Sequence, residues 1–153
     1  MGEPAIHLAE VNELDPREAA SKVASAFQGQ PGRLDEFAQH LDRYRAGQSL
    51  ARTLAVWGLS QSEAAQLFGV SRQAVSKWTD RGVPSERSEA VADLAAATDL
   101  LVNYLQRDRI PAVVRRPIAA LNNQSLVALL AENQTRTILK ACRDMFDFDQ
   151  ARQ

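Results

Sequence analysis

Along most of the 153-residue chain, apolar residues recur every three or four positions, the spacing that places them on one face of an α-helix. Alternating apolar and polar positions, which predict strands, are few, and the sequence contains no Asn-Gly or Asp-Gly pair of the kind that closes tight hairpins. The pattern therefore predicts an all-α fold: a helix-turn-helix unit followed by a long helix and a small C-terminal helical region.

Three helices are predicted before residue 59. Asp15, as cap, and Pro16, in the first turn, are typical of a helix start, and Glu18 is placed to bond back to the cap. A glycine after a run of apolar positions predicts a helix end. The predicted spans run from Pro16 toward Phe27, from about Leu34 to Gly47, and from a cap at Ser49 to Trp57.

The stretch from residue 59 to residue 78 carries the most specific pattern. Ser60 and Glu63 have the spacing of a capping box at the start of a short helix. Gly69 supplies the left-handed residue that turns the chain sharply, and Ser71 caps the next helix. The sequence therefore predicts two short helices with a tight turn between them.

On the second of these helices, Val75 and Trp78 point inward, which leaves a polar and basic outer face. This order of residue types resembles the pattern Q-x-x-x-A-x-x-x-G-V-S-x-x-x-V-S-x-W of bacterial helix-turn-helix regulators. A generic helical hairpin with a glycine turn is the alternative, but it has no need of such an outer face. The matching residues are Gln61, Ala65, Gly69, Val70, Ser71, Val75, Ser76 and Trp78.

A helix that enters the major groove with its first turn can read bases directly. Arg72 can bond a guanine with two hydrogen bonds, and Gln73 can do the same for an adenine. Backbone amides at residues 60–62 can hold a phosphate, and Arg52 and Arg81 are either phosphate contacts or solvated surface. Trp57 and Trp78 are predicted as core residues rather than base-stacking platforms. The predicted DNA-binding residues are Ser60, Gln61, Ser62, Ser71, Arg72, Gln73, Ser76, Lys77 and Arg81.

Beyond Pro84, the sequence predicts a long helix from about Glu86 to Arg107, capped by Ser85. Its apolar stripe suits either the core of its own domain or a dimer seam, and both remain open. Shorter segments follow at 117–121, at 126–131 after Ser125, and after a cap at Thr135. The predicted division is an N-terminal helical extension (1–48), a DNA-binding unit (49–84), and a partner-binding or dimerisation region (85–153).

The order of segments after residue 50 resembles the Xre/MbcA/ParS antitoxin family. The residues that carry this resemblance are Pro117, Leu121, Ser125, Leu126, Leu129, Leu130 and the stretch 138–145. Two departures stand out, because Asn122-Asn123 and Asn133 occupy positions where that family commonly has glycine. The first 48 residues have no counterpart in the resemblance.

The resemblance implies an antitoxin that represses its own promoter and binds a toxin enzyme with a RES domain, which degrades NAD. It also implies that Phe146, Asp147 and Phe148 contribute to the surface that blocks the toxin, the alternative being a frayed amphipathic terminus. The predicted function is a sequence-specific transcriptional repressor that extends to this antitoxin role. The alternative is a stand-alone or phage-type repressor with no toxin partner.

The distribution of charge along the chain refines the prediction of how the protein binds DNA. Eighteen Lys and Arg against nineteen Asp and Glu give a net charge of -1, which excludes a protein that coats nucleic acid by bulk charge. Residues 1–49 carry five basic and eight acidic side chains (-3), residues 50–87 five and three (+2), and residues 88–153 eight of each (0). The small surplus lies on the predicted DNA-binding unit, so we expect shallow salt dependence and useful affinity only for a homodimer on double-stranded DNA.

The sequence offers few other residues or motifs for catalysis or metal binding. His7 and His40 have no partners at zinc-ligand spacing, and neither a phosphate-binding glycine loop nor a G-x-S-x-G motif occurs. A His40–Cys142 base and nucleophile pair has no local support, so a surface histidine and a core cysteine are expected. The sequence thus predicts no enzyme and no cofactor. The lone cysteine favours a cytoplasmic location, and no signal peptide or apolar run of bilayer length is present.

Overall fold

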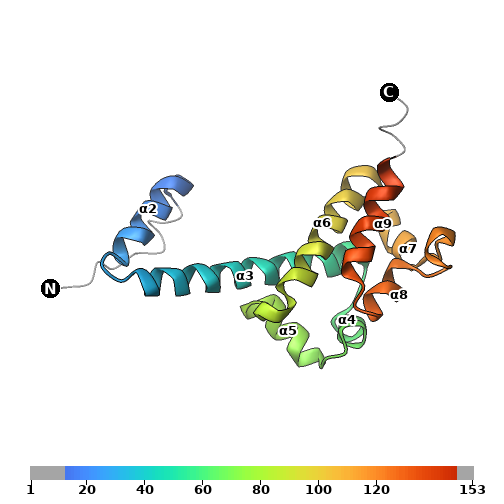
Figure 1. Cartoon of the computed structure of the whole chain (residues 1–153), viewed down its shortest axis with the longest axis horizontal. Helices are drawn as coiled ribbons and strands as arrows, with labels where there is room; N and C mark the ends of the chain where they lie inside the picture. The colour runs from blue at the N-terminus through green and yellow to red at the C-terminus, as the bar shows by residue number, and fades with distance from the viewer. Residues whose placement is uncertain (1–12, 148–153) are drawn as a thin grey trace. The chain divides into compact units, whose positions relative to one another are not determined.

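The computed structural model describes residues 13–147, and over this range the fold is all-α, as the sequence predicts (Figure 1). The chain divides into two compact units, residues 1–41 and residues 42–153, with the boundary inside one helix. The α-helices are α2 (Pro16–Ala26), α3 (Pro31–Trp57), α4 (Gln61–Phe68), α5 (Arg72–Arg81), α6 (Ser88–Tyr104), α7 (Ile110–Arg115), α8 (Leu126–Ala131) and α9 (Thr135–Asp147). Short 3-10 turns lie at Ser85–Arg87, Arg107–Arg109 and Ala119–Leu121.

In the first unit, α2 begins at Pro16 as predicted, but the side chain of Asp15 makes no capping hydrogen bond. The Phe27 ring, just past the end of α2, lies against the Phe37 ring of α3 with 5.6 Å between ring centroids. The Arg33 guanidinium sits 5.8 Å from the centroid of Phe27. Aromatic contact therefore joins the two helices of this unit.

The prediction of two helices between residues 34 and 57 is wrong, because α3 runs without a break from Pro31 to Trp57. Gly47 is buried in the middle of α3 rather than at a helix end, and Ser49 is an interior residue rather than a cap. A β-carbon at Gly47 would collide with the backbone carbonyl oxygen of Trp78. The glycine is needed for this close approach of α3 to α5, not to stop the helix.

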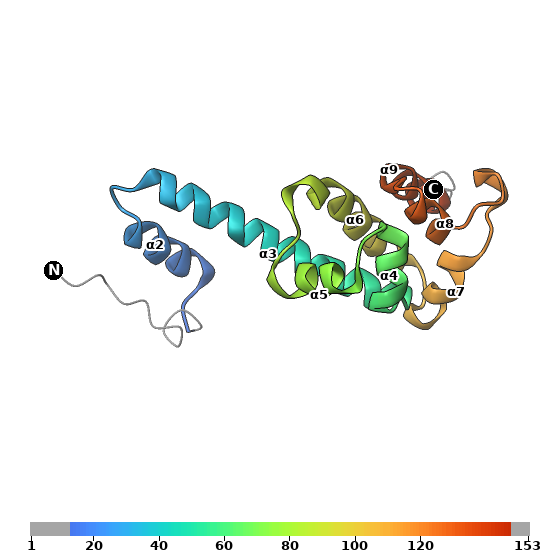
Figure 2. The same cartoon turned by 90° about the horizontal axis from the view of Figure 1, so that it is seen from below.

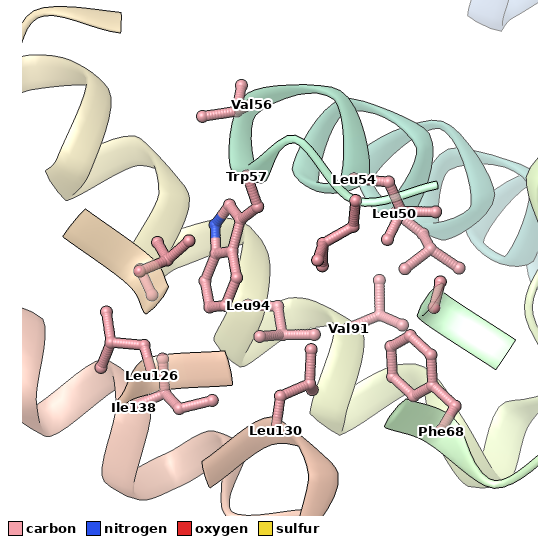
Figure 3. Close-up of a cluster of buried hydrophobic side chains, with 14 of the residues drawn as sticks. Leu50, Leu54, Val56, Trp57, Phe68, Val91, Leu94, Leu126, Leu130 and Ile138 are labelled. Atoms are coloured by element: carbon pink, nitrogen blue, oxygen red, sulfur yellow. The ribbon is translucent and has the colours of Figure 1, made fainter. Parts of the chain in front are cut away.

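The core of the second unit lies between α3, α4, α6 and the C-terminal helices. Figure 3 shows Trp57 of α3 pointing toward Leu94 of α6, with Leu126 and Ile138 beside it. The Trp57 indole N–H donates to the Thr98 hydroxyl (3.0 Å), and this hydroxyl donates to the Leu94 carbonyl (2.7 Å). Trp57 is thus a fully buried core residue, as predicted, and its one polar atom has a partner.

Helix α6 is shorter than predicted, since a 3-10 turn precedes it and it ends at Tyr104. It lies alongside α9 in both views (Figures 1 and 2), and its buried residues include Val91, Leu94 and Leu101. Val102 and Leu105, which continue the same apolar stripe, are half-buried. The greater part of the apolar stripe is therefore used by the core of its own unit, which is one of the two predicted alternatives.

The C-terminal region departs from prediction at two helix starts. Helix α7 was not predicted because Pro111 reads as a helix terminator, whereas it occupies the first turn of α7, where proline is tolerated. Thr135 is the first residue of α9 rather than its cap, and its hydroxyl donates to Asp93 of α6 (3.2 Å). Helix α8 forms over the predicted residues, and the Ser125 hydroxyl caps it by accepting from the Ala128 amide (3.0 Å).

The asparagines at the departures from the antitoxin pattern adopt the backbone conformation that glycine favours. Asn122, Asn123 and Asn133 have φ values of 56°, 61° and 58°. Asparagine enters this left-handed region more readily than other non-glycine residues. The departures in residue type are therefore compatible with the turns that glycine would make.

Candidate nucleic-acid interface

Helices α4 and α5 form with the caps and the turn that the sequence predicts. The Ser60 hydroxyl accepts from the Glu63 amide (3.1 Å), and the Ser71 hydroxyl accepts from the Ala74 amide (3.0 Å). Between the helices, Gly69 has φ 67°, and the Val70 amide donates back to the Ala65 carbonyl (2.9 Å). Each helix start is thus fixed by its own serine, and the left-handed glycine sets the turn between them.

The second half of the predicted capping box does not form. The Glu63 carboxylate accepts from Arg115 of α7 (2.9 Å) instead of reaching back to the cap. Arg115 also donates to the Gly58 carbonyl (3.0 Å). This arginine ties the end of α3, the start of α4 and the end of α7 together.

The inner face of α5 is held by aromatic contacts. Val75 and Trp78 are buried, as predicted, and the Trp78 ring meets the edge of Phe68 from α4 at 6.0 Å between centroids. The Arg87 guanidinium lies 5.1 Å from the Trp78 centroid and donates to the Phe68 carbonyl (3.3 Å). Arg87 therefore packs α5 against the end of α4, a role that sequence reasoning missed because its partners are distant along the chain.

The outer face of α5 is polar and free of internal ion pairs. Within residues 13–147, none of the salt bridges involves Arg72, Lys77 or Arg81. At the start of α4, Ser60 and Ser62 are exposed and Gln61 is half-buried. The exposed side chains at and along α5 are Ser71, Arg72, Gln73, Ser76, Lys77, Asp80 and Arg81, so one acidic side chain lies among the basic ones.

Arg52, the other phosphate candidate, is engaged within its own unit. Its guanidinium lies 2.5 Å from the Asp99 carboxylate of α6, and both side chains are partly solvent-exposed. A pair between two partly exposed side chains contributes little to stability. Arg52 is thus part of a surface pair, whereas Arg72, Lys77 and Arg81 on α5 take part in none of the salt bridges within residues 13–147.

The predicted partner-binding residues lie at the end of α9. The Phe146 ring stacks on Tyr104 with 4.5 Å between centroids and an interplanar angle of 9°. Asp147 is exposed and is the last residue of α9, while Phe148 lies outside the described residues. Tyr104 itself is 45% exposed, so the aromatic pair is accessible from solvent.

The remaining candidate residues, His40 and Cys142, lie in different environments within the part of the chain that the structure describes. His40 is exposed beside Glu36, whereas Cys142 is fully buried, and burial raises the pKa of its thiol to about 12. A protonated thiol is a poor nucleophile at neutral pH. Across residues 13–147, no group of three or more His, Cys, Asp or Glu side chains is placed to hold a metal ion. In the same range, no helix has the length and apolar character needed to cross a bilayer.

Comparison with solved structures shows a likeness of fold to a chain of a toxin–antitoxin complex. The fold is similar to that of a chain in the crystal structure of the M. tuberculosis MbcT–MbcA toxin–antitoxin complex. The TM-score is 0.53 at 21% sequence identity, over 65% of this chain and 91% of that chain. No family model matches the sequence. A search of curated proteins finds no match either.

At 21% identity the likeness shows a shared fold. It spans most of the other chain but leaves about a third of this one unmatched, so this chain has a substantial part without a counterpart there. The likeness therefore does not bear on DNA binding. The case for an interface on α4 and α5 has to come from the positions and exposure of its own side chains.

Proposed function

We propose that this protein is a sequence-specific DNA-binding repressor that inserts the start of α5 into the major groove. The observation that carries the proposal is the division of α5 into two faces. Val75 and Trp78 are buried against the unit, while Arg72, Gln73 and Lys77 are exposed and free of salt bridges within the described residues. A helix held rigidly on its inner face can present its outer face to base edges.

Each exposed residue has a defined place in the proposed contact. Arg72 and Gln73, in the first turn of α5, are the base readers, since their side chains bond guanine and adenine with two hydrogen bonds each. Ser76 and Lys77 lie one turn further along and contact bases or phosphates. The exposed start of α4, with Ser60 and Ser62, lies against a phosphate and positions the unit.

The experiment that tests this proposal is selection of bound sequences from a random pool of double-stranded DNA at physiological salt. We expect enrichment of one motif, repeated with two-fold symmetry at about one helical turn if two copies bind. Recovery of sequences without any shared motif would reject sequence-specific recognition. A chain with Arg72→Ala and Gln73→Ala, passed through the same selection, should lose the motif, and one with Arg143→Ala on α9 should keep it.

We further propose that the repressor is the antitoxin of a toxin–antitoxin pair and that it binds a RES-domain toxin. Two observations support this: the likeness of fold to a chain of the MbcT–MbcA complex, and the left-handed conformations at Asn122, Asn123 and Asn133. In this proposal the protein acts by binding and has no catalytic role. The exposed end of α9, with Phe146 and Asp147, is the proposed toxin-facing surface.

The antitoxin proposal is tested through the neighbouring genes. A RES-domain reading frame beside this gene, toxic when expressed alone and harmless when co-expressed with this chain, is the expected result. Growth arrest that persists on co-expression would overturn the antitoxin role and leave the stand-alone repressor. A Phe146→Asp variant should lose protection while it retains DNA binding, because the α5 surface is unchanged.

A further inference from the structure

A second basic segment lies around the short helix α7, outside the helix-turn-helix. Residues 107–116 carry four arginines and one acidic side chain, a net charge of +3. Helix α5 carries three basic side chains and one acidic side chain, a net charge of +2. The zero balance of residues 88–153 therefore conceals a local surplus as large as that of α5. The arginines are Arg107, Arg109, Arg115 and Arg116, and the acidic residue is Asp108.

Helix α7 is fixed to the turn that leads into α4. The Arg115 guanidinium donates to the Glu63 carboxylate of α4 (2.9 Å) and to the Gly58 carbonyl (3.0 Å). Pro111, in the first turn of α7, also lies against Gly58, because a β-carbon at this glycine would come 3.1 Å from the proline side chain. Figures 1 and 2 both show α4 between α5 and α7. Both ends of α7 are thus held beside the start of α4.

The solvent-facing side of α7 presents two of the arginines. Ile110 and Val114 are buried, so the helix packs through one side and leaves the other open. Arg109 and Arg116 are seven residues apart, about two helical turns, and therefore fall on the same side. Both are exposed, as is Ala112 between them. Within the described part of the chain, neither arginine takes part in a salt bridge.

Charge and position together define the partner that this face fits. A guanidinium group matches the geometry of a phosphate, which it can bind with two hydrogen bonds. The face is next to the first turn of α4, where the exposed Ser60 and Ser62 meet a phosphate in the proposed function. An acidic protein surface would match the charge of the face but not its place beside α4. The backbone of the bound duplex matches both.

We propose that Arg109 and Arg116 bind backbone phosphates of the DNA that flanks the bases read by α5. This inference rests on the proposed function, because it takes the place of the duplex from α4 and α5. The bonds of Arg115 to Glu63 and Gly58 hold the two arginines at a fixed place beside α4. Phosphate contacts read no base, so they strengthen binding to every sequence alike. They also add to the contacts of α5, which makes the salt dependence steeper than α5 alone produces.

The test is fluorescence anisotropy of the full chain on two duplexes, one cut at the ends of the selected motif and one extended by about one helical turn on each side. A chain with Arg109→Ala and Arg116→Ala should bind the extended duplex about tenfold or more weakly than the wild-type chain, with its preference over a scrambled duplex unchanged. With two copies bound, the slope of log K against log salt should lose about 4 in magnitude. On the cut duplex, which lacks the flanking phosphates, the variant and the wild-type chain should bind alike.

The matched control is a chain with Lys140→Ala and Arg143→Ala, which removes two positive charges from exposed positions on α9. It should bind the extended duplex with the wild-type affinity and slope. Urea unfolding should show that both double variants keep the wild-type free energy of unfolding, since the four side chains are exposed.

Wild-type affinity of the α7 variant for the extended duplex would overturn the inference. So would an equal loss in the α9 control, because the effect would then follow net charge rather than position. An α7 variant that keeps DNA affinity but no longer protects against the toxin would assign the face to an acidic protein instead. Absence of sequence preference in the wild-type chain would reject the proposed function, and the comparison on a scrambled duplex would still decide whether α7 binds phosphates.

Discussion

Glycine has two different uses in this protein, and only one of them is visible from the sequence. Gly69 adopts a left-handed conformation with open space around it, so its backbone freedom makes the turn before α5. Gly47 is an ordinary helical residue whose missing side chain makes room for the Trp78 carbonyl. A local pattern can indicate a turn, but the position of a backbone atom thirty residues away is a property of the packed fold.

Gly47→Ala tests this account of the close approach. Overpacking against a backbone carbonyl costs about 1–3 kcal/mol and outweighs the gain of at most about 1 kcal/mol from better helix propensity. We therefore expect a lower free energy of unfolding in urea. Gly32→Ala, on the same helix with no atom near the added β-carbon, is the control and should not lose stability. Equal stability of the two variants would contradict the close approach.

The buried thiol of Cys142 predicts a loss of stability at alkaline pH. Its pKa is raised from 9.0 to about 12 in the folded chain, so the unfolded chain loses the thiol proton first as the pH rises. The stabilising contribution is present below pH 9 and declines between pH 9 and 12, by up to about 1.4 kcal/mol per pH unit.

The measurement is urea unfolding of the wild-type chain and of Cys142→Ala at pH 8 and pH 10. The stability advantage of the wild-type chain should shrink by about 1 kcal/mol over this interval. An advantage that stays constant would show that the thiol ionises equally in both states.

At the scale of elements, the sequence predicted those helices whose start and end signals are local. Helices α4, α5 and α8 each follow the serine that was predicted to cap them, and α8 covers the predicted residues 126–131. Helix α3 and helix α7 were mispredicted because Gly47 and Pro111 act through their positions in the packed chain. The polar outer face and the buried inner face of α5 could be predicted because exposed and buried positions follow the helical period. The roles of Arg87 and Arg115 could not, because they depend on partners distant along the chain.

Removal of the Ser71 hydroxyl tests whether this side chain stabilises the start of α5. Ser71→Ala leaves the Ala74 amide without its partner and should lower the free energy of unfolding by about 0.5–2 kcal/mol. Ser62→Ala, at an exposed position in the first turn of α4, should change stability by less than about 0.5 kcal/mol. Thermal unfolding compares them, and equal stability would contradict the capping role of Ser71.

At the scale of the whole molecule, a net charge of -1 conceals a small basic surface on one helix. With Lys77 and Arg81 as the phosphate-neutralising groups of each copy, two bound copies should give a slope of about -4 when log K is plotted against log salt. Lys77→Ala should reduce the magnitude of this slope by about 2, as followed by fluorescence anisotropy. A slope near zero, or one unchanged in Lys77→Ala, would contradict binding through α5.

The central claim is that α5 reads DNA sequence, and the most direct measurement is the affinity of the chain for its selected site relative to a scrambled site at physiological salt. The account predicts that the wild-type chain binds the selected site more tightly than the scrambled site. This difference in binding free energy should fall by about 1–3 kcal/mol in Arg72→Ala and by a similar amount in Gln73→Ala. The free energy of unfolding of both variants should be unchanged. Arg143→Ala should retain the wild-type preference. Equal affinity of the wild-type chain for both DNAs, or an unreduced preference in both α5 variants, would contradict the claim.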